Sequence, residues 1–491
     1  MGKKTDKSIR DLLFGDTWEY APAPQSSDFV DLDDYYGHYI GGEFVESEES
    51  FQTINPATEE PIAEIGSADA EMVDRAVRAA RSAYDNHWSK LDGKERSKYI
   101  YRIARMIKEK ARDLAVVETM DGGKPIRESR DVDIPLASAH FFYYAGWADK
   151  LDYAFPGADV DSLGVAGQII PWNFPLLMAA WKIAPALATG NTVVIKPAET
   201  TPLTAMMLAE IIDEAGLPPG TVNIVNGAGE TGAAIVDHDD VDKIAFTGST
   251  AVGKHIQRSV AGTDKKLTLE LGGKGANIIF DDASLDQAVE GIVNGIFFNQ
   301  GHVCCAGSRL LVQESIEDEV LAKLRHRMSS LVVGDPLDKN TDVGAINSGE
   351  QLGRIQQLVD AGEAEGATKI QPRCSIPETG YFFAPTVFTD VTQSHRIAQE
   401  EIFGPVLSVL TFRTPEEAIE KANNTAYGLA CGIWSDKGSK LFRVAGALKA
   451  GVVWGNTYNK FDPGSPFGGY KESGFGREGG AHGLLPYLEV K

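Results

Sequence analysis

Hydrophobic positions along the chain follow two spacings, one typical of helices and one typical of buried strands. Between residues 73 and 84 the apolar side chains recur at helical spacing and Asp and Arg residues occupy the other face, which predicts an amphipathic helix packed on a core. The β-branched run 192–195 predicts a buried strand. A helix is then expected to begin with Thr201 as its cap and Pro202 in its first turn, and to end at Gly216.

Strands and helices continue to alternate after residue 216. Further strands are predicted at 222–225, 243–246 and 267–269, and a second alternating series runs from about 277 to 456. Near residue 39 a Gly-Gly pair predicts a hairpin turn at the start of the ordered chain. Because βα alternation with short connections is typical of parallel sheets, we expect an α/β fold with two doubly wound parallel-sheet domains.

Composition and charge exclude several classes of protein. The chain has 491 residues, enough for two or three domains, and a net charge of −23, which would repel a phosphate backbone and predicts no nucleic-acid partner. The simplest interpretation of that charge is a well-solvated surface. No apolar run is long enough to span a membrane and no secretory signal follows Met1, so we expect a soluble, cytoplasmic protein with no membrane partner.

The cysteines indicate thiol chemistry and no metal. The chain has four of them, Cys304, Cys305, Cys374 and Cys431, without the paired spacing of metal ligands. Two adjacent cysteines would make an awkward disulfide framework. We therefore expect reduced thiols, one of which is free to be reactive.

Two segments at predicted strand ends have features of a dinucleotide site. The run 248–253, Gly-Ser-Thr-Ala-Val-Gly, follows a strand and opens a helix, whose free N–H groups and dipole suit a pyrophosphate. Lys196 and Glu199 lie where parallel strands present ligand-binding groups, and their side chains can hydrogen-bond ribose hydroxyls. A tight turn and a solvated loop pair are the competing interpretations of these two segments.

Three further segments suggest an acyl-transfer site. Asn173 lies in Pro-Trp-Asn-Phe-Pro, where its amide can face a developing oxyanion or be a buried structural group. Cys304 lies in the glycine-rich stretch 297–309, as expected of a nucleophile. Glu270 ends a buried strand beside two glycines, where a carboxylate is costly unless it is paired or acts as a general base.

Taken in order, the motifs PWNFP, KPAE, FTGST, ELGGK, NQGxxCC, EEIFGP and SPFGGYK resemble those of the aldehyde dehydrogenase superfamily, from about Tyr39 to the C-terminus. The resemblance implies oxidation of an aldehyde to the acid with NAD, NADP being possible. It implies Cys304 as the nucleophile, the Asn173 amide and the Cys304 N–H as oxyanion donors, and Glu270 as the base that activates water. Lys182 and Glu478 match residues that relay protons to this glutamate.

The resemblance also assigns a cofactor site and a substrate tunnel. The cofactor residues it implies are Ile169, Ile170, Trp172, Lys196, Glu199, Gly229, Gly248, Ser249, Glu401 and Phe403. The tunnel residues it implies are Phe174, Met178, Trp181, Phe461 and Phe467, for which an ordinary aromatic core is the alternative.

The carboxylate of Glu199 favours NAD over NADP, although the neighbouring Lys196 leaves NADP open. Glu270 favours hydrolysis over transfer of the acyl group to coenzyme A. His302 precedes the nucleophile where many relatives have Gln; it is expected to shape the pocket, and a role as base for the thiol is the alternative.

By resemblance, the chain divides into an arm (1–36), an NAD-binding domain (37–148 and 164–272), a short oligomerisation hairpin (149–163), a catalytic domain (273–474) and a C-terminal segment (475–491). A homodimer is expected. However, the hairpin interval is short, and the chain stops where relatives extend the strand that pairs with it. Either the oligomer forms differently or the chain is truncated.

The arm is similar to that of family 16 of the superfamily through Leu-Leu-Phe-Gly at 12–15. Some members of that family have lost the nucleophile, so a non-catalytic scaffold is the alternative function. The presence of Cys304, Glu270 and Asn173 argues against it.

Overall fold

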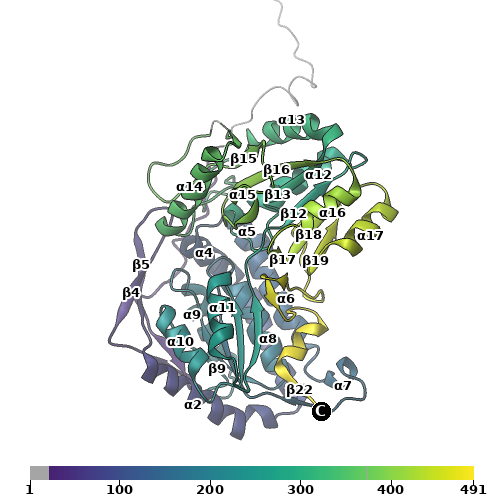
Figure 1. Cartoon of the computed structure of the whole chain (residues 1–491). Coiled ribbons are helices and arrows are strands. Elements are labelled where there is room, and N and C mark those ends of the chain that lie inside the picture. The colour runs from purple at the N-terminus through teal and green to yellow at the C-terminus, as the bar shows by residue number, and fades with distance from the viewer. Residues whose placement is uncertain (1–20, 373) are drawn as a thin grey trace, which may run out of the picture.

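The computed structural model describes residues 21–372 and 374–491, so the Leu-Leu-Phe-Gly motif of the arm lies outside the described residues. Two mainly parallel sheets, each flanked by helices, form the lower and upper parts of the molecule in Figure 1. The α/β class with doubly wound parallel sheets is therefore confirmed.

The first sheet has the strand order β21-β11-β10-β7-β8-β9-β2-β3. Its parallel strands are β7 (Val165–Ile169), β8 (Thr192–Lys196), β9 (Val222–Ile224), β10 (Lys243–Thr247) and β11 (Lys266–Glu270). Its antiparallel strands are β2 (His38–Ile40), β3 (Glu43–Val45) and, from the far end of the chain, β21 (Gly474–Phe475). The order reverses between β7 and β10, and such a switch point is where open α/β sheets bind ligands.

The second sheet has the order β14-β15-β16-β13-β12-β18-β19. Its strands are β12 (Ala276–Ile279), β13 (Arg309–Gln313), β14 (Thr368–Ile370), β15 (Thr386–Thr389), β16 (Val406–Phe412), β18 (Ala430–Trp434) and β19 (Val452–Gly455). Only β14, at one edge, is antiparallel to its neighbour among these strands. Helices α12 (Leu285–Phe297), α13 (Glu317–Met328), α14 (Gly349–Ala364), α16 (Pro415–Asn423) and α17 (Gly438–Ala447) surround this sheet (Figure 1).

The helices around the first sheet include one that is buried on every side. Every residue of α8 (Pro175–Ala188) is buried, as expected of a helix that is apolar all round. The other helices of this part are α2 (Ala70–Asn86), α3 (Gly93–Glu109), α4 (Ala111–Gly122), α6 (Ile134–Ala145), α9 (Leu203–Glu214), α10 (Gly229–Asp237) and α11 (Thr250–Ser259). Because α8 carries several of the predicted site residues, its burial fixes their positions.

The local predictions for this part of the chain are largely confirmed. The amphipathic segment 73–84 lies within α2, and the four strands predicted up to residue 269 are β8, β9, β10 and β11. Gly41 and Gly42 turn the β2–β3 hairpin with φ values of 66° and 85°, a left-handed conformation that favours glycine.

The predicted cap of α9 is wrong. The hydroxyl oxygen of Thr201 makes no hydrogen bond within the described chain, and the helix begins at Leu203. The Leu203 N–H donates instead to a carboxylate oxygen of Asp121, at 3.0 Å. A side chain 82 positions away thus accepts the hydrogen bond from the first N–H of the helix. A local sequence pattern cannot reveal such a partner.

The segment 149–163 is not a hairpin, contrary to the prediction. It holds one helical turn, α7 (Leu151–Ala154), and a single strand, β6 (Val160–Ser162). That strand pairs antiparallel with β22 (Leu488–Val490) near the C-terminus, at the bottom of Figure 1. The partner of this strand therefore comes from the distant chain end and not from within the segment.

A three-stranded sheet of β1 (Tyr35–Tyr36), β5 (Pro61–Gly66) and β4 (Ser50–Ile54) and the pair β17 (Tyr427–Gly428) and β20 (Tyr470–Lys471) complete the strands. Within residues 21–372 and 374–491, no helix combines the length and the apolar character needed to cross a membrane.

Candidate active site

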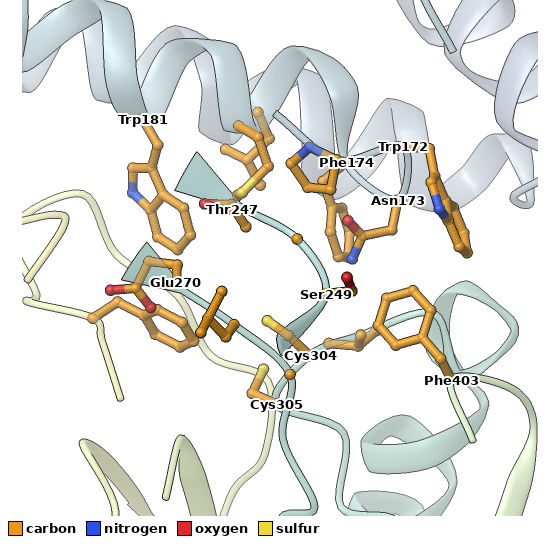
Figure 2. A pocket seen from close by; sticks show the side chains of 18 of the residues that line it. Trp172, Asn173, Phe174, Trp181, Thr247, Ser249, Glu270, Cys304, Cys305 and Phe403 are labelled. Atoms are coloured by element: carbon orange, nitrogen blue, oxygen red, sulfur yellow. The ribbon is translucent and has the colours of Figure 1, made fainter. Parts of the chain in front are cut away.

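A pocket with about 1170 Å³ of empty space lies where the carboxyl ends of β10 and β11 face the loop before β13. Most of the predicted residues line it: Asn173, Phe174, Met178, Trp181, Trp172, Gly248, Ser249, Glu270, Cys304, Glu401, Phe403, Phe461, Phe467 and Glu478. Figure 2 shows Cys304 between Glu270 on one side and Asn173 on the other. The fold therefore brings the predicted nucleophile, base and amide to one place.

The segment 298–308 carries the predicted nucleophile Cys304, and this nucleophile loop has an unusual backbone. After α12 the chain passes through three consecutive left-handed residues, Asn299, Gln300 and Gly301, with φ values of 48°, 51° and 75°. A Cβ on Gly301 would lie 2.1 Å from the carbonyl oxygen of Gly404, so only glycine fits there. Such strain persists where surrounding contacts hold it, and here it turns Cys304 toward the pocket. Cys304 is partly exposed, whereas Cys305 is buried.

Asn173 is held by a hydrogen-bond network that includes a residue the sequence analysis missed. Its Nδ2 donates to the carbonyl oxygen of His302, at 2.8 Å. Asn299 uses its own Nδ2 to donate to the backbone carbonyl of Asn173, at 2.8 Å, and its main-chain N–H donates to Glu128, at 2.8 Å. Asn299 therefore ties the amide to the nucleophile loop. Its only sequence signal was its place in Asn-Gln-Gly.

Glu270 is a buried carboxylate to which no described residue donates a hydrogen bond. Neither of its oxygens accepts a hydrogen bond from any described residue. Burial, and then the negative charge of Glu478, raise the pKa of Glu270 well above its ordinary value, while the Lys182 cation lowers it. An unpaired carboxyl in a pocket with a raised pKa is suited to accept and return a proton.

The pKa of the Cys304 thiol, like that of Glu270, is raised. Hydrogen bonding with the Cys305 thiol, and then burial, raise the pKa of Cys304 well above its ordinary value. The negative charge of Cys304 also contributes to raising the pKa of Glu270. Because the two charges oppose each other, a thiolate at Cys304 is favoured when the proton resides on Glu270.

Lys182 does not line the pocket but reaches it through Glu478. Its ammonium donates to a Glu478 carboxylate oxygen, and the two side chains are 0% and 6% exposed. The other Glu478 oxygen has no partner among the described residues. Antiparallel pairing of β21 with β11 brings this C-terminal segment beside Glu270.

The His302 ring faces aromatic side chains. It lies 4.8 Å from the Trp172 ring and 5.8 Å from the Phe403 ring, measured between centroids. Burial lowers the pKa of His302 to about 3, so the imidazole is neutral near neutral pH. This packing favours the pocket-shaping interpretation of His302 over a role as base for Cys304.

One side of the pocket carries groups suited to a nucleotide. Ser249 caps α11, its hydroxyl accepting from the Val252 N–H at 3.3 Å. Glu401 accepts from the Gly273 N–H at 2.9 Å, and burial raises its pKa to about 7. A Cβ on Gly272 would lie 2.2 Å from a Glu401 oxygen, so this carboxylate needs a glycine beside it.

The remaining predicted cofactor residues lie outside the pocket lining. Ile169 and Lys196 end adjacent strands β7 and β8, and Ile170 follows the first of them. The Lys196 ammonium donates to the Gly227 carbonyl at 2.6 Å and lies 3.5 Å from the half-exposed Glu199. Gly229 begins α10, and a Cβ there would meet nothing within 4 Å, so this helix start is open.

These groups fit a dinucleotide. The open start of α10 and the Ser249-capped start of α11 offer N–H groups to phosphates, and Glu199 and Glu401 offer carboxylates to ribose hydroxyls. The hydroxyl of Thr247, buried at the end of β10, has no partner in the described chain.

The side of the pocket that holds the predicted substrate-tunnel residues is aromatic. Trp181 contacts Phe467 at 5.3 Å and Phe461 at 6.4 Å between ring centroids, and Phe174 stacks on Phe298 at 6.2 Å. All these rings line the pocket. The wall offers apolar contact and few polar groups.

Gln351 and Arg354 also line the pocket, and sequence reasoning missed both. Gln351 donates from Nε2 to the Phe403 carbonyl, at 2.8 Å, and so holds a residue whose φ is +55°. Both lie in the early turns of α14, where no periodic pattern sets them apart from other exposed helix residues.

Comparisons with known proteins agree with this geometry. The family model described as "Aldehyde dehydrogenase family" matches residues 44–491. The chain is 48% identical over 465 residues to the putative aldehyde dehydrogenase DhaS of Bacillus subtilis, covering 92% of this chain and 94% of that protein. It is 46% identical to the human mitochondrial aldehyde dehydrogenase, covering 98% and 95% of the two chains.

A solved structure described as the NAD+ complex of an aldehyde dehydrogenase from Bacillus cereus is similar in fold, with a TM-score of 0.90 and 45% identity, covering 92% of this chain and 95% of that one. The resemblance to family 16 stays a prediction. The chain belongs to the aldehyde dehydrogenase family.

Proposed function

We propose that this chain carries out the NAD-dependent oxidation of an aldehyde to the carboxylic acid through a thioester on Cys304 that water then hydrolyses. The observation that carries this proposal is the convergence of Cys304, Asn173 and Glu270 on one pocket. The nucleotide-binding groups on the other side of Cys304 support NAD as the cofactor.

In the first half-reaction, Cys304 gives its proton to Glu270 and the sulfur attacks the aldehyde carbon, forming a thiohemiacetal. The Asn173 amide and the Cys304 N–H hold the negative oxygen, because donors placed at a developing oxyanion stabilise the transition state. NAD, when bound, supplies the acceptor for the hydride of that carbon. The acyl group is then left on sulfur as a thioester.

In the second half-reaction, Glu270 takes a proton from water while the oxygen attacks the thioester carbon. The carbon–sulfur bond breaks, the acid leaves, and Cys304 recovers its proton. Glu270 supports hydrolysis over transfer to coenzyme A. The presence of nucleophile, amide and base together supports an enzyme over a non-catalytic scaffold.

The cofactor would be held by Trp172 and Phe403 beside Cys304, by Glu401 near one ribose, and by Lys196 and Glu199 near the other. The helix starts at Gly229 and at Gly248–Ser249 would take the pyrophosphate, and Ile169 and Ile170 would cover it. Glu199 supports a preference for NAD, since its charge repels a 2′-phosphate.

The substrate class we propose is an aldehyde with an apolar side chain. Phe174, Met178, Trp181, Phe461 and Phe467 all line the pocket and offer it hydrophobic contact. Val132 and Leu136 extend the same wall.

The expected homodimer and cytoplasmic location also stay proposals. Tyr153 and Phe442, 81% and 85% exposed, are large apolar side chains that a second copy would cover. A working Cys304 thiol needs a reducing compartment, which supports the cytoplasm.

The test compares NADH formation by the wild type, Cys304→Ala and Glu270→Gln with a series of aliphatic and aromatic aldehydes. Cys304→Ala is expected to form no NADH, and Glu270→Gln is expected to slow both NADH formation and the release of the acid, because Glu270 accepts a proton in both half-reactions. The control is Cys431→Ala, which removes a buried thiol within β18 and should keep full activity. Activity that survives Cys304→Ala would refute the proposal.

A further inference from the structure

A second cavity lies at the end of β10 and β11 opposite to the active-site pocket. Its polar lining consists of Lys243, Lys266, Thr268, Arg477 and His482. Lys243 and Lys266 begin β10 and β11, whereas the active-site pocket is at the carboxyl ends of the same strands. The two cavities are therefore reached from opposite ends of these strands.

Strand β11 provides the shortest connection between the cavities. Thr268 lines the second cavity and Glu270 lines the active-site pocket. Residues two apart on a strand point to the same face and are about 7 Å apart. A proton on Glu270 is therefore one strand repeat away from the second cavity.

Lys243 lies at the inner end of that cavity. Its side chain is 0% exposed, and its Nζ donates to the Thr268 hydroxyl at 2.7 Å and to the Ile244 carbonyl at 3.1 Å. It also lies 5.6 Å from the centre of the Tyr487 ring. Burial lowers the pKa of Lys243 well below its ordinary value, while the Glu478 charge raises it and the Lys182 charge lowers it further. A neutral amine that donates two hydrogen bonds keeps a lone pair free to accept a proton.

Two buried polar side chains near Lys243 and Glu270, Gln168 and Glu478, lack full partners among the described residues. Gln168 donates to the Lys182 carbonyl at 2.8 Å and to the Tyr487 hydroxyl at 3.3 Å, and its own side-chain oxygen is buried with no partner among the described residues. One carboxylate oxygen of Glu478 is likewise buried with no partner among the described residues. Buried polar atoms are nearly always paired, so the unpaired oxygens of Gln168 and Glu478 are free to accept hydrogen bonds beside Lys182 and Tyr487.

The proposed reaction requires a path for one proton. Glu270 receives the thiol proton when Cys304 attacks, and it must lose that proton before it can accept one from water. At that stage the acyl group and the cofactor occupy the main pocket. A route that avoids the main pocket would let the second half-reaction proceed while both remain bound.

We propose that Lys243, held by Thr268, forms the exit for this proton. The proton passes from Glu270 through Glu478 to the Lys243 amine, which becomes an ammonium and releases the proton to solvent in the second cavity. Lys243 touches neither substrate nor cofactor; it acts on the reaction through Glu270, whose proton it takes up. This inference rests on the function proposed above.

The test uses an activated ester, p-nitrophenyl acetate, without any cofactor, because the ester forms the same kind of thioester on Cys304. The wild type should release a burst of p-nitrophenolate and then turn over at the rate of thioester hydrolysis. Lys243→Met should keep the amplitude of the burst and lower the later rate by about ten-fold or more, within the range of proton-transfer catalysis. The solvent deuterium isotope effect on that later rate should increase, because proton departure then limits it.

Lys266→Met is the matched control. It removes an amine from the same cavity, but that amine is half-exposed and paired with Glu489 at 3.1 Å, so both phases should stay within about two-fold of the wild type, as expected of a surface pair. Thr268→Val is the second variant: it keeps the shape of the side chain, removes the hydroxyl that holds Lys243, and should slow the later phase alone.

Normal thioester hydrolysis in Lys243→Met and Thr268→Val would overturn the exit, and so would a parallel loss of both phases, which indicates a structural role. A burst that persists in Cys304→Ala would instead refute the proposed function.

Discussion

The buried pair of Lys182 and Glu478 gives a quantitative test of the site's electrostatics. In Lys182→Met an apolar chain of similar length replaces the lysine, and the Glu478 carboxylate is left almost fully buried without its partner. In the double variant Lys182→Met/Glu478→Met neither charge remains. The comparison separates the cost of an unpaired charge from the value of the pair.

Removing one partner of a buried ion pair costs about 3–5 kcal/mol, whereas replacing both with apolar residues is often nearly neutral. The unfolding entropy of globular proteins is about 2.1 cal/mol/K per residue, which for this chain gives about 1 kcal/mol/K. Lys182→Met should therefore lower the melting temperature by about 3–5 °C, and the double variant should recover most of that loss.

The assay is differential scanning calorimetry of the three proteins at one scan rate and one protein concentration, since unfolding of a chain this large depends on both. Lys243→Met serves as a comparison, because it removes a buried amine whose hydrogen bonds within the described chain go to a hydroxyl and a carbonyl oxygen. A double variant that melts as low as Lys182→Met, or lower, would show that the pair itself is strongly stabilising and would refute the reasoning.

Two further predictions concern pH and cofactor choice. Glu478→Gln removes a charge that raises the pKa of Glu270, so Glu270 ionises at lower pH and the rising limb of the pH profile of thioester hydrolysis should move to lower pH; a limb that moves to higher pH would contradict the assignment of Glu270 as the base. Glu199→Gln removes the carboxylate that would repel a 2′-phosphate, so the ratio of kcat/KM for NADP to that for NAD should rise by about ten-fold or more, and an unchanged ratio would place the adenosine ribose elsewhere.

Much of the fold followed from local patterns. The β-branched run at β8 and the helical spacing within α2 predicted their elements because periodicity reports directly which face of a segment is buried. The start of α9 and the hairpin at 149–163 were mispredicted. In both cases the hydrogen-bond partner, Asp121 or strand β22, is far away in the sequence.

The residues of the candidate site also divide into those that the sequence predicted and those that it did not. Cys304, Glu270 and Asn173 were predicted from sequence because each lies in a motif that resembles one of the aldehyde dehydrogenase family. Asn299 and Gln351 were missed because their roles rest on hydrogen bonds to backbone carbonyls of segments far along the chain. No spacing within their own segments reflects such contacts.

The sequence by itself determined the α/β class and the order of the chemical motifs, and through their resemblance to a family it predicted the nucleophile, since these depend on residue type and local spacing. Only the tertiary structure decided how Glu478 reaches Glu270, through β21 at the sheet edge, and that Lys243 and Thr268 line a second cavity at the other end of the strands. The physical reason is that burial and electrostatic coupling depend on distances across the core, and strand order sets those distances.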